Sequence, residues 1–479
     1  MIQGLNEQQQ AAVQLPAAHA LVLAGAGSGK TRVLTTRIAW LIQTSQVSPG
    51  GVLAVTFTNK SARELLSRLT AQLPINTRGM WVGTFHGLAN RLLRIHYREA
   101  GLPQSLYTYQ LPLSRKAGPE TEALGAQLIM FSTYSYLGLI GNPRIQRAVK
   151  EAIDLYGTST GGVRLLTGTL QLHHQLEREL ARFLGQPGAA VFASGYDANL
   201  AAITSLFGPD DVAILDQYAH QSIHDGVRMA HCDVRRFKHN DMEDLERRLR
   251  QAKNRGARRI LIAVDSVFSM DGDQAPIAEI IELKKKYDAF LLVDEAHSIG
   301  AIGETGRGVC EAQGIDPHDI DILTGSLSKA VPSSGGFVAG SLGLKYYIQH
   351  GSAPYMFSAA LTPANSAAIL ETLRILQEEP AHMERLRENT RMLIDGLHEL
   401  GLETPPTTTP VVPVLLGDEF KAYRWARQLL DRGIFVSAVV YPAVSPGQAR
   451  LRLCATAAHR PEHFERLFEA LRECQEMEP

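Results

Sequence analysis

The chain alternates short apolar runs with longer segments whose apolar residues recur at helical spacing. AFLLVDEAHSIG and RRILIAVDS contain apolar runs of strand length, whereas NPRIQRAVKEAIDLYG and QLHHQLERELARFLG are amphipathic and end at glycine. Strands and helices alternate in this way as far as about residue 345, which predicts a mostly parallel sheet with helices on both faces. From residue 346 two helical segments precede short strands and a last helix, so we expect a smaller C-terminal α/β domain there.

The segment ALVLAGAGSGKTRVL near the N-terminus predicts a strand, a glycine-rich loop and a helix. Its loop fits the pattern (A/G)xxxxGK(S/T), which here runs from Ala24 to Thr31. Backbone N–H groups of such a loop cradle phosphates, a lysine such as Lys30 reaches the β- and γ-phosphates, and the hydroxyl of Thr31 would bind Mg²⁺. The pattern therefore predicts a nucleotide-binding P-loop.

The first hundred residues resemble the start of UvrD/Rep-type DNA helicases. The resemblance rests on LNEQQQAAV, VLAVTFTNKSARE and MWVGTFHGLANRLLR, and it extends from Leu5 to about Gln104. It implies that Gln9 reads adenine and that the other two motifs touch single-stranded DNA. The candidate residues for binding ATP and Mg²⁺ are Gln9, Gly27, Ser28, Gly29, Lys30 and Thr31.

The motifs that would make this segment a motor do not follow it. Neither the DExxQ acids nor a second motor domain is encoded after Gln104, and without those acids Mg²⁺ and the attacking water lack their positioning carboxylates. VDEAH at 293–297 resembles the DEAH box of another helicase class, but its surroundings fit a different chemistry. We therefore expect a truncated P-loop segment at 1–105 without DNA-driven ATPase activity. A helicase-like ATP- and DNA-binding protein and a nucleotide-regulated fusion are the alternatives.

The composition argues against several classes of protein and does not by itself indicate a function. The 479 residues are enough for two or three domains, and a formal net charge of −1 gives no basic field for nucleic acid. The four cysteines are scattered without a zinc or disulfide spacing, so we expect no bound metal and reduced thiols in a cytoplasmic protein. No apolar run approaches the ~20 residues of a membrane helix, and the polar start MIQGLNEQQQ does not resemble a signal peptide.

The strongest chemical signal lies at the ends of two predicted strands. TGSLSKAVPSSGG places Lys329 among serines and glycines, which leave room for a bulky group on its nitrogen. AFLLVDEAHSIG ends its apolar run in Asp294, and His297 follows in the same motif. Pyridoxal 5'-phosphate (PLP) chemistry needs a lysine that forms a Schiff base with the cofactor and an acid that partners the pyridinium nitrogen. The two motifs together predict a PLP enzyme.

From about Leu106 to its end the chain resembles the α-oxoamine synthases, which include 8-amino-7-oxononanoate synthase, 2-amino-3-ketobutyrate CoA ligase and serine palmitoyltransferase. The motifs that carry the resemblance keep their order along the chain: STYSYLGL, STGGVRLLTGT, FASGYDANL, LDQYAHQSIHDG, VFSMDGDQAP, LLVDEAHSIGAIGETGRG, GSLSKAVPSSGG, PYMFSAAL and ARLRLCATAAH. The resemblance implies an α/β enzyme of PLP fold type I, with an entering arm and large domain at 106–345 and a small α/β domain at 346–479. It also implies a homodimer, because active sites of this family form between two chains.

The resemblance further implies a role for each matched residue. The expected catalytic residues are Lys329 as the cofactor lysine, Asp294 on the pyridinium nitrogen, His297 on the phenolic oxygen and His220 stacked on the ring. The expected cofactor-binding residues are Gly195 and Tyr196 through backbone N–H groups, Ser326 through its hydroxyl, Ser269 at the adjacent strand end, and Ser358, which would reach the phosphate of the neighbouring subunit. Arg452 would clamp the carboxylate of the amino-acid substrate, and Tyr136 would also bind substrate.

The implied reaction is a decarboxylative condensation of a small amino acid with an acyl thioester, but the signals for the substrate conflict. Ser135 stands where the family commonly has asparagine, Ser266 where glycine is usual, and Tyr441 where several members have arginine. STYSYLGL resembles serine palmitoyltransferase, whereas Tyr441 followed by proline resembles the ketobutyrate ligase. Glycine, alanine and serine therefore all remain candidate amino acids, and CoA and acyl-carrier-protein thioesters remain candidate acyl donors.

Overall fold

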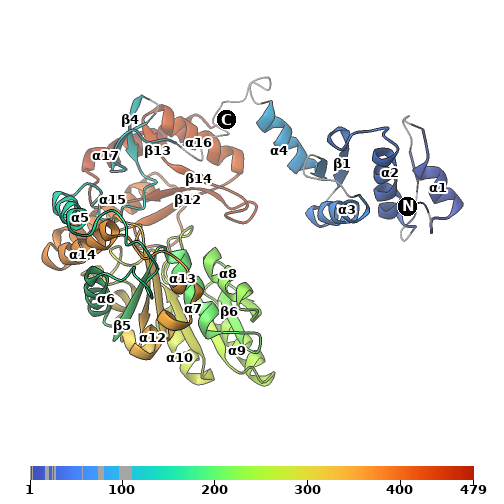
Figure 1. Cartoon of the computed structure of the whole chain (residues 1–479). Coiled ribbons are helices and arrows are strands. Elements are labelled where there is room, and N and C mark those ends of the chain that lie inside the picture. The colour runs from blue at the N-terminus through green and yellow to red at the C-terminus, as the bar shows by residue number, and fades with distance from the viewer. Residues whose placement is uncertain are drawn as a thin grey trace. The chain divides into compact units, whose positions relative to one another are not determined.

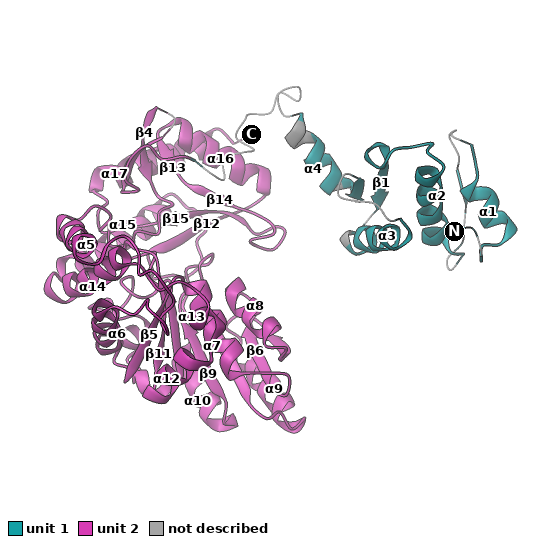
Figure 2. Cartoon of the chain, in the orientation of Figure 1, with its two compact units in different colours: residues 1–111 teal, residues 112–479 magenta. Residues whose placement is uncertain are grey.

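The structure is a computed structural model that describes residues 2, 4–16, 21–23, 25, 28–56, 58–73, 80–96, 111–123 and 125–478. The chain divides into two compact units, residues 1–111 and residues 112–479 (Figure 2). Each unit has its own hydrophobic core.

The first unit surrounds a two-stranded parallel sheet with helices. Its core consists of apolar residues from two helices and the sheet, with Leu65 and Leu69 almost completely buried at its centre. The elements are α1 (Glu7–Val13), α2 (Lys30–Gln43), β1 (Leu53–Thr56), α3 (Asn59–Gln72), β2 (Trp81–Thr84) and α4 (Phe85–Ile95). Helix α1 begins with a capping box, in which Asn6 accepts from the backbone of Gln9 and the Gln9 side chain accepts from the backbone of Asn6.

The strand predicted immediately before the glycine-rich loop does not form in the described residues, so this expectation is wrong. Leu21 and Leu23 are 85% and 86% exposed and belong to no strand. A strand at this position would need partners at its edge, and the described part of the unit contains only β1 and β2, which pair with each other. The helix after the loop does form, since α2 begins at Lys30.

The second unit contains the mostly parallel sheet that the sequence predicts, and this prediction is confirmed. Its strands run in the order β5–β11–β10–β9–β8–β6–β7, and all neighbours are parallel except the two pairs that involve β11. The strands are β5 (Gly188–Phe192), β6 (Val212–Asp216), β7 (Asp233–Phe237), β8 (Ile260–Asp265), β9 (Phe290–Asp294), β10 (Ile322–Ser326) and β11 (Gly336–Gly340).

Both faces of this sheet are apolar because side chains alternate along each strand. In β8, Ile260, Ile262 and Val264 join one core cluster, whereas Leu261 and Ala263 join the other. The first face is covered by α5 (Pro143–Tyr156), α6 (Gln171–Leu184), α9 (Met242–Asn254), α10 (Ile277–Tyr287) and α14 (Pro363–Glu378). The second face is covered by α7 (Gly195–Leu206), α8 (Gln221–Met229) and α12 (Leu342–Gly351) (Figure 1).

The C-terminal part of this unit forms a smaller layer of strands and helices. An antiparallel sheet has the order β12–β15–β14, and it shares a core with the helices that surround it. The elements are α15 (Ala381–Glu399), β12 (Val411–Gly417), α16 (Glu419–Asp431), β13 (Ile434–Phe435), β14 (Ser437–Val439), β15 (Ala449–Cys454) and α17 (Pro461–Glu476). Across the described ranges, no helix combines the length and the apolarity needed to cross a membrane.

The entering arm, expected from residue 106, contains paired strands in its described part. Strand β3 (Glu120–Ala123) pairs with β4 (Ala126–Met130), and β4 also pairs with β13 of the C-terminal part (Figure 1). Leu128 and Met130 are buried as a result. A local sequence pattern gives no sign of the pairing between β4 and β13, because β13 lies near the other end of the chain.

Candidate active site

The candidate site lies where the parallel strands of the large sheet end. Strands β8, β9 and β10 end at Asp265, Asp294 and Ser326, and the carboxyl ends of parallel strands meet at one edge of a sheet. The pairing of β8 with β9 places Asp265 directly beside Asp294. Lys329 follows β10 and interacts electrostatically with both acids. The topology therefore gathers two carboxylates and a lysine from three neighbouring strands.

Asp294 is buried and held by two hydrogen bonds. Its Oδ1 accepts from the backbone N–H of Ala296 at 2.9 Å, and its Oδ2 accepts from the side-chain amide of Asn199 at 2.7 Å. The same amide donates to Ser222 at 2.9 Å, and its oxygen accepts from the hydroxyl of Thr324 at 2.6 Å. Such donors stabilise an ionised carboxylate and fix its direction, so Asp294 is preorganised to face a cationic partner.

Asp265 differs from Asp294 although the two lie side by side. Burial raises its pKa well above the ordinary aspartate value, and repulsion from Asp294 adds to the effect. It accepts one hydrogen bond of 3.3 Å, from the backbone N–H of His220. Burial and this repulsion therefore favour the protonated form of Asp265.

Lys329 lies in a water-poor environment without an ion pair or hydrogen bond to any described residue. Burial lowers the pKa of its ammonium group, whereas the nearby carboxyl groups of Asp294 and Asp265 act in the opposite direction. A lysine whose pKa is lowered has more of the neutral amine that acts as a nucleophile or base. Lys329 is therefore suited to both tasks.

His297 sits at the side of the site toward the N-terminal arm of the unit. Its Nδ1 and the hydroxyl of Tyr136 form a 2.8 Å hydrogen bond, which leaves Nε2 as the ring nitrogen available to a ligand. Burial lowers the pKa of His297 well below its ordinary value, and Lys329 adds to the effect, so the imidazole is neutral at pH 7. Tyr136 is completely buried, and burial raises the pKa of its phenol. Whether Tyr136 also contacts substrate stays a prediction.

Arg452 is a buried arginine at the site, and one nitrogen of its guanidinium group makes no hydrogen bond to a described residue. It is 3% exposed, its Nε donates to the backbone oxygen of Ser269 at 2.5 Å, and its Nη1 donates to the sulfur of Cys454 at 3.1 Å. Its guanidinium carbon lies 4.7 Å from the ring centroid of Tyr134. Its Nη2 is buried and has no hydrogen-bond partner among the residues that the structure describes. Leaving a buried cationic donor without a hydrogen-bond acceptor costs about 1–3 kcal/mol of stability or more. An anionic ligand that accepts from Nη2 would remove this cost.

The first turn of α7 offers a place for a phosphate. The helix begins at Gly195 after the N-cap Ser194, and a twelve-residue helix presents free N–H groups there. A Cβ at Gly195 would lie 2.8 Å from the Cβ of Ser326, so only glycine allows this approach. Ser326 shares a 2.6 Å hydrogen bond with Ser328. The structure thus brings together Gly195, Tyr196 and Ser326, although the Tyr196 side chain points to Asp225.

Three further predicted residues have different positions relative to this cluster. His220 caps α8, and burial lowers the pKa of its imidazole while the Asp294 carboxylate partly offsets the effect, so the ring is neutral. Ser269 contacts Arg452 through its backbone oxygen, while its contact with the cofactor stays a prediction. Ser358 follows α13 (Ala353–Met356) and has no hydrogen bond to the other site residues within the described part of the chain.

Sequence reasoning missed three side chains of the site. Asn199 lies one helical turn after Gly195 within FASGYDANL, and this spacing could have marked it as facing the strand ends. Asp265 ends a strand in the same way as Asp294, which was a usable signal. Tyr134 gave no signal, because nothing in its local sequence indicates that an arginine from β15 would lie over its ring.

The predicted P-loop of the first unit is partly within the described residues. The Gln9 side chain donates to the backbone oxygen of Ser28 at 3.1 Å, and Lys30 donates to that of Gly25 at 2.9 Å. Gly29 caps α2 with φ of 79°, and Thr31 lies in the first turn. Ala24 and Gly27 lie outside the described residues. The helix of the adenine motif and the glycine-rich loop are therefore in contact, while their role stays a prediction.

The fold and the lysine–aspartate site define a fold-type-I PLP enzyme. The chain belongs to the aminotransferase class I and II family, whose profile matches residues 126–471. The profile of the UvrD/REP helicase N-terminal domain matches residues 5–153, a longer range than the motifs indicate.

Individual relatives and solved structures that resemble the chain are synthases and acyltransferases by name. The chain is 42% identical to 8-amino-7-oxononanoate synthase 1 of Bacillus velezensis over 75% of its own length and 91% of the relative. It is 37% identical to serine palmitoyltransferase of Bacteroides ovatus over 80% and 97%. Among solved structures, a variant of serine palmitoyltransferase from S. paucimobilis with a bound PLP–myriocin aldimine has a TM-score of 0.76 and 34% identity, and the match covers 82% of this chain and 97% of that chain. An 8-amino-7-oxononanoate synthase from Francisella tularensis has a TM-score of 0.63 and 26% identity, and covers 73% and 98%.

The residues present in this chain fit PLP. The start of α7 has room for a phosphate because Gly195 lacks a side chain, and Asp294 suits a protonated ring nitrogen. The Nη2 of Arg452 retains an unmet hydrogen bond that suits the carboxylate of an amino acid.

The protonated state of Asp265 gives a testable dependence of stability on pH. Its folded-state pKa is raised above the value of about 3.9 in an unfolded chain, so stability is complete below that value and is lost as the pH rises through the folded-state pKa. Asp265→Asn removes the ionisable group, so the variant does not lose stability in this way as the pH rises. We expect the melting temperature of the cofactor-free variant to exceed that of the parent by a margin that grows as the pH rises above about 3.9, the pKa of aspartate in an unfolded chain.

Asp288→Asn is the matched control, because the Asp288 side chain is 98% exposed and its variant should follow the parent at every pH. A constant difference between Asp265→Asn and the parent would show that Asp265 is ionised throughout.

Proposed function

We propose that residues 112–479 form a PLP-dependent acyltransferase that condenses glycine, alanine or serine with an acyl thioester of CoA or a carrier protein. The amino acid loses its α-proton, its Cα forms a bond to the acyl carbon, the thiol leaves, and the carboxylate is released as CO₂ to give an α-aminoketone. The observation that carries the proposal is the group of Lys329, Asp294 and the unsatisfied Arg452 at one edge of the sheet.

PLP supplies an electron sink for the charge that develops at Cα of the amino acid. The chain supplies the remaining requirements. Asp294, oriented by Asn199, holds a proton on the ring nitrogen, and Arg452 holds the substrate carboxylate. Lys329, with its lowered pKa, takes the proton from Cα. The neutral rings of His220 and His297 bind the cofactor by contact and hydrogen bonding, and so add no further positive charge beside Arg452.

The choice of amino acid and acyl donor stays open among the proposed candidates. The relatives by name include a serine palmitoyltransferase and 8-amino-7-oxononanoate synthases. Ser135 is buried with an unpartnered hydroxyl, and Ser266 donates to the backbone of Asp294 at 2.8 Å. Both positions depart from the family pattern and lie at or beside the site. This supports the proposal that the amino-acid preference of the chain differs from that of either relative.

We also propose a cytoplasmic homodimer. The segment around Ser358 supports the dimer, since Phe357 and Leu166 are each 80% exposed and an isolated bridge joins Val163 to Ala359 between them. An exposed apolar surface of this kind is typical of a surface that a partner covers. The four cysteines are unpaired, which supports a reducing compartment.

A second candidate function, nucleotide binding by the first unit, is favoured by the contact between Gln9 and the glycine-rich loop. A helicase-like or nucleotide-regulated role would follow from it. We propose that this unit does not hydrolyse ATP in response to DNA, because Walker-B acids are not encoded in it.

Replacing Lys329 tests the proposed enzyme directly. Lys329→Ala should fold, lose the visible absorbance of lysine-bound PLP, and release thiol from acyl-CoA at least about a thousandfold more slowly, because the group that removes the α-proton is gone. Lys285→Ala is the control, since Lys285 is a surface residue paired with Asp319. Normal thiol release by Lys329→Ala would refute the proposal.

The dimer is tested by light scattering. We expect the parent to have twice the mass of the 52.4 kDa chain, and Phe357→Asp to weaken association about 100-fold or more by placing a charge in the apolar contact. Phe420→Asp is the matched control, because Phe420 is 82% exposed on α16. A fully active parent monomer would contradict the proposed assembly.

Removal of the first unit separates the two candidate functions. A chain that begins at Pro112 should release thiol within about twofold of the full-length rate, because residues 112–479 have their own core. The full-length chain should show no ATP hydrolysis that depends on single-stranded DNA. ATPase activity that disappears in Lys30→Ala would overturn the second expectation, and loss of thiol release from a folded truncated chain would indicate a regulatory role for the first unit.

A further inference from the structure

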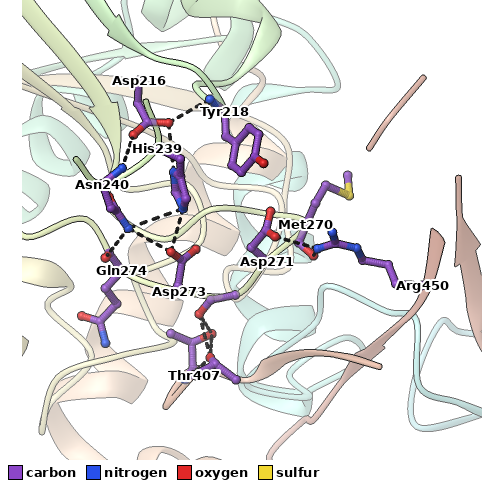
Figure 3. Close-up of polar contacts among 12 residues, drawn as sticks. Asp216, Tyr218, His239, Asn240, Met270, Asp271, Asp273, Gln274, Thr407 and Arg450 are labelled. Carbon is purple, nitrogen blue, oxygen red and sulfur yellow. Dashed lines mark hydrogen bonds and ion pairs between the residues drawn. The ribbon is translucent and has the colours of Figure 1, made fainter. Parts of the chain in front are cut away.

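A histidine outside the site described above lies between two carboxylates. The Nδ1 of His239 is 3.0 Å from Oδ1 of Asp216, and its Nε2 is 2.7 Å from Oδ2 of Asp273 (Figure 3). The ring of Tyr218 lies 4.5 Å from the imidazole, centroid to centroid, and that of Phe268 lies 4.4 Å away. The histidine is thus fixed at both nitrogens and on two sides of its ring.

This arrangement keeps His239 charged. Burial alone would lower its pKa, but hydrogen bonds and charge interactions with Asp216 and Asp273 outweigh burial and raise the pKa to about 10. The charged groups that face the ring are Asp216 from the end of β6 and Asp273 from the loop after β8, while Asn240 adds only a neutral amide. An imidazolium with two donated hydrogen bonds is therefore the stable form at neutral pH.

Both acids need this cation. The side chain of Asp216 is completely buried, and Oδ1 of Asp273 is buried without a hydrogen-bond partner in the described part of the chain. Without the charge on His239, two carboxylates would remain close together, and that of Asp216 is completely buried, which costs free energy and drives the two apart. Asp273 is the one that can move, because it lies in a loop.

That loop, residues 266–275, is called the Ser269 loop below. It folds back on itself through the bridge between Val267 and Gln274, and the backbone N–H of Phe268 donates to the oxygen of Asp273 at 3.0 Å. Asp273 is therefore at the base of the loop, and Ser269 to Gly272 form its tip. A shift of Asp273 is passed to the tip through these backbone bonds.

The tip contacts the C-terminal part of the unit at several points. Arg450 forms an ion pair of 2.7 Å with Asp271 and donates to the backbone oxygen of Met270 at 3.1 Å (Figure 3). The hydroxyls of Thr407 and Thr409 both donate to the oxygen of Gly272, at 2.7 Å and 2.8 Å. The loop is thus held at its base by His239 and at its tip by the C-terminal strands.

The contact that matters for chemistry is the one with Arg452. Arg450 and Arg452 are two residues apart on β15, so both side chains leave the same face of the strand toward the loop. The oxygen of Ser269 fixes the Nε of Arg452, and this bond sets the direction of the unpartnered Nη2. The position of Ser269 therefore decides where the guanidinium meets a substrate carboxylate.

We propose that His239 is a positioning residue for substrate binding, which holds the Ser269 loop through Asp273 and thereby aims Arg452 at the carboxylate of the amino acid. The proposal rests on the proposed function, because it needs an amino-acid substrate. It assigns His239 no contact with substrate or cofactor.

The test is equilibrium binding of glycine, L-alanine and L-serine to the full-length PLP-loaded protein, followed by visible absorbance. His239→Gln removes the charge, and Asp273→Asn breaks the same link from the loop side. A misplaced contact of about 1 Å can cost about 100-fold, so we expect the dissociation constant to rise about tenfold or more in each variant. Thiol release at saturating amino acid should fall less than about threefold, because Lys329 and Asp294 are untouched. The double variant should be no worse than the more impaired single variant.

Controls separate this role from a purely structural one. His463→Gln removes a buried histidine that pairs with Glu120 away from the loop, and it should bind amino acids as the parent does. Unchanged dissociation constants in His239→Gln and Asp273→Asn would overturn the proposal. So would losses that appear equally in binding, in saturated rate and in PLP content, since those would indicate general unfolding.

A second readout does not depend on activity. In ¹⁵N-histidine-labelled protein, the His239 signals, identified by their loss in His239→Gln, should show both ring nitrogens protonated until the pH approaches 10. A neutral His239 at about pH 8 would overturn the charged positioning role. A parent that binds none of the three amino acids would refute the proposed function, whereas normal parental binding with unaffected variants refutes only the role of His239.

Discussion

The site depends on the electrostatic interactions among three ionisable groups at the ends of neighbouring strands, Asp265, Asp294 and Lys329. Parallel pairing of β8 and β9 puts Asp265 and Asp294 side by side, and Lys329 follows the next strand. The hydrogen bonds break the symmetry between the acids, because Asp294 accepts from Asn199 and Ala296, whereas Asp265 accepts a longer bond from the backbone of His220. Two adjacent buried carboxylates cannot both ionise easily, and burial together with repulsion from Asp294 raises the pKa of Asp265, so Asp265 is the acid that retains a proton more readily.

The rest of the unit supplies what this charge pair lacks. The helix start at Gly195 offers donors for a phosphate, and β15 of the C-terminal part contributes Arg452. The C-terminal strands and the large sheet meet at the loop of residues 266–275, so the arginine reaches the site in a fixed direction. A catalytic centre built on strand ends therefore depends on packing between two parts of the chain that are remote in sequence.

The sequence predicts the large sheet well, because most of its strands are short apolar runs that alternate with helices along the chain. It predicts Lys329, Asp294 and His297 for the same reason, since each lies in a motif directly after a strand. It could not predict contacts between distant segments: the pairing of β4 with β13, the ring of Tyr134 beneath Arg452, or the backbone oxygen of Ser269 as the partner of that arginine. The strand expected near Leu21 failed for the opposite reason, because an apolar run forms a strand only where a sheet edge receives it.

The central claim is that this site joins an amino acid to an acyl group, and not that it merely exchanges an amino group as other members of the aminotransferase class I and II family could. The most direct measurement is mass spectrometry of the products formed from a ¹³C-labelled small amino acid and an acyl-CoA, with free thiol followed in the same sample. The account predicts an α-aminoketone that retains the labelled Cα and appears in equal amount to the thiol. A labelled keto acid formed without thiol release, or thiol release that does not require the amino acid, would contradict it.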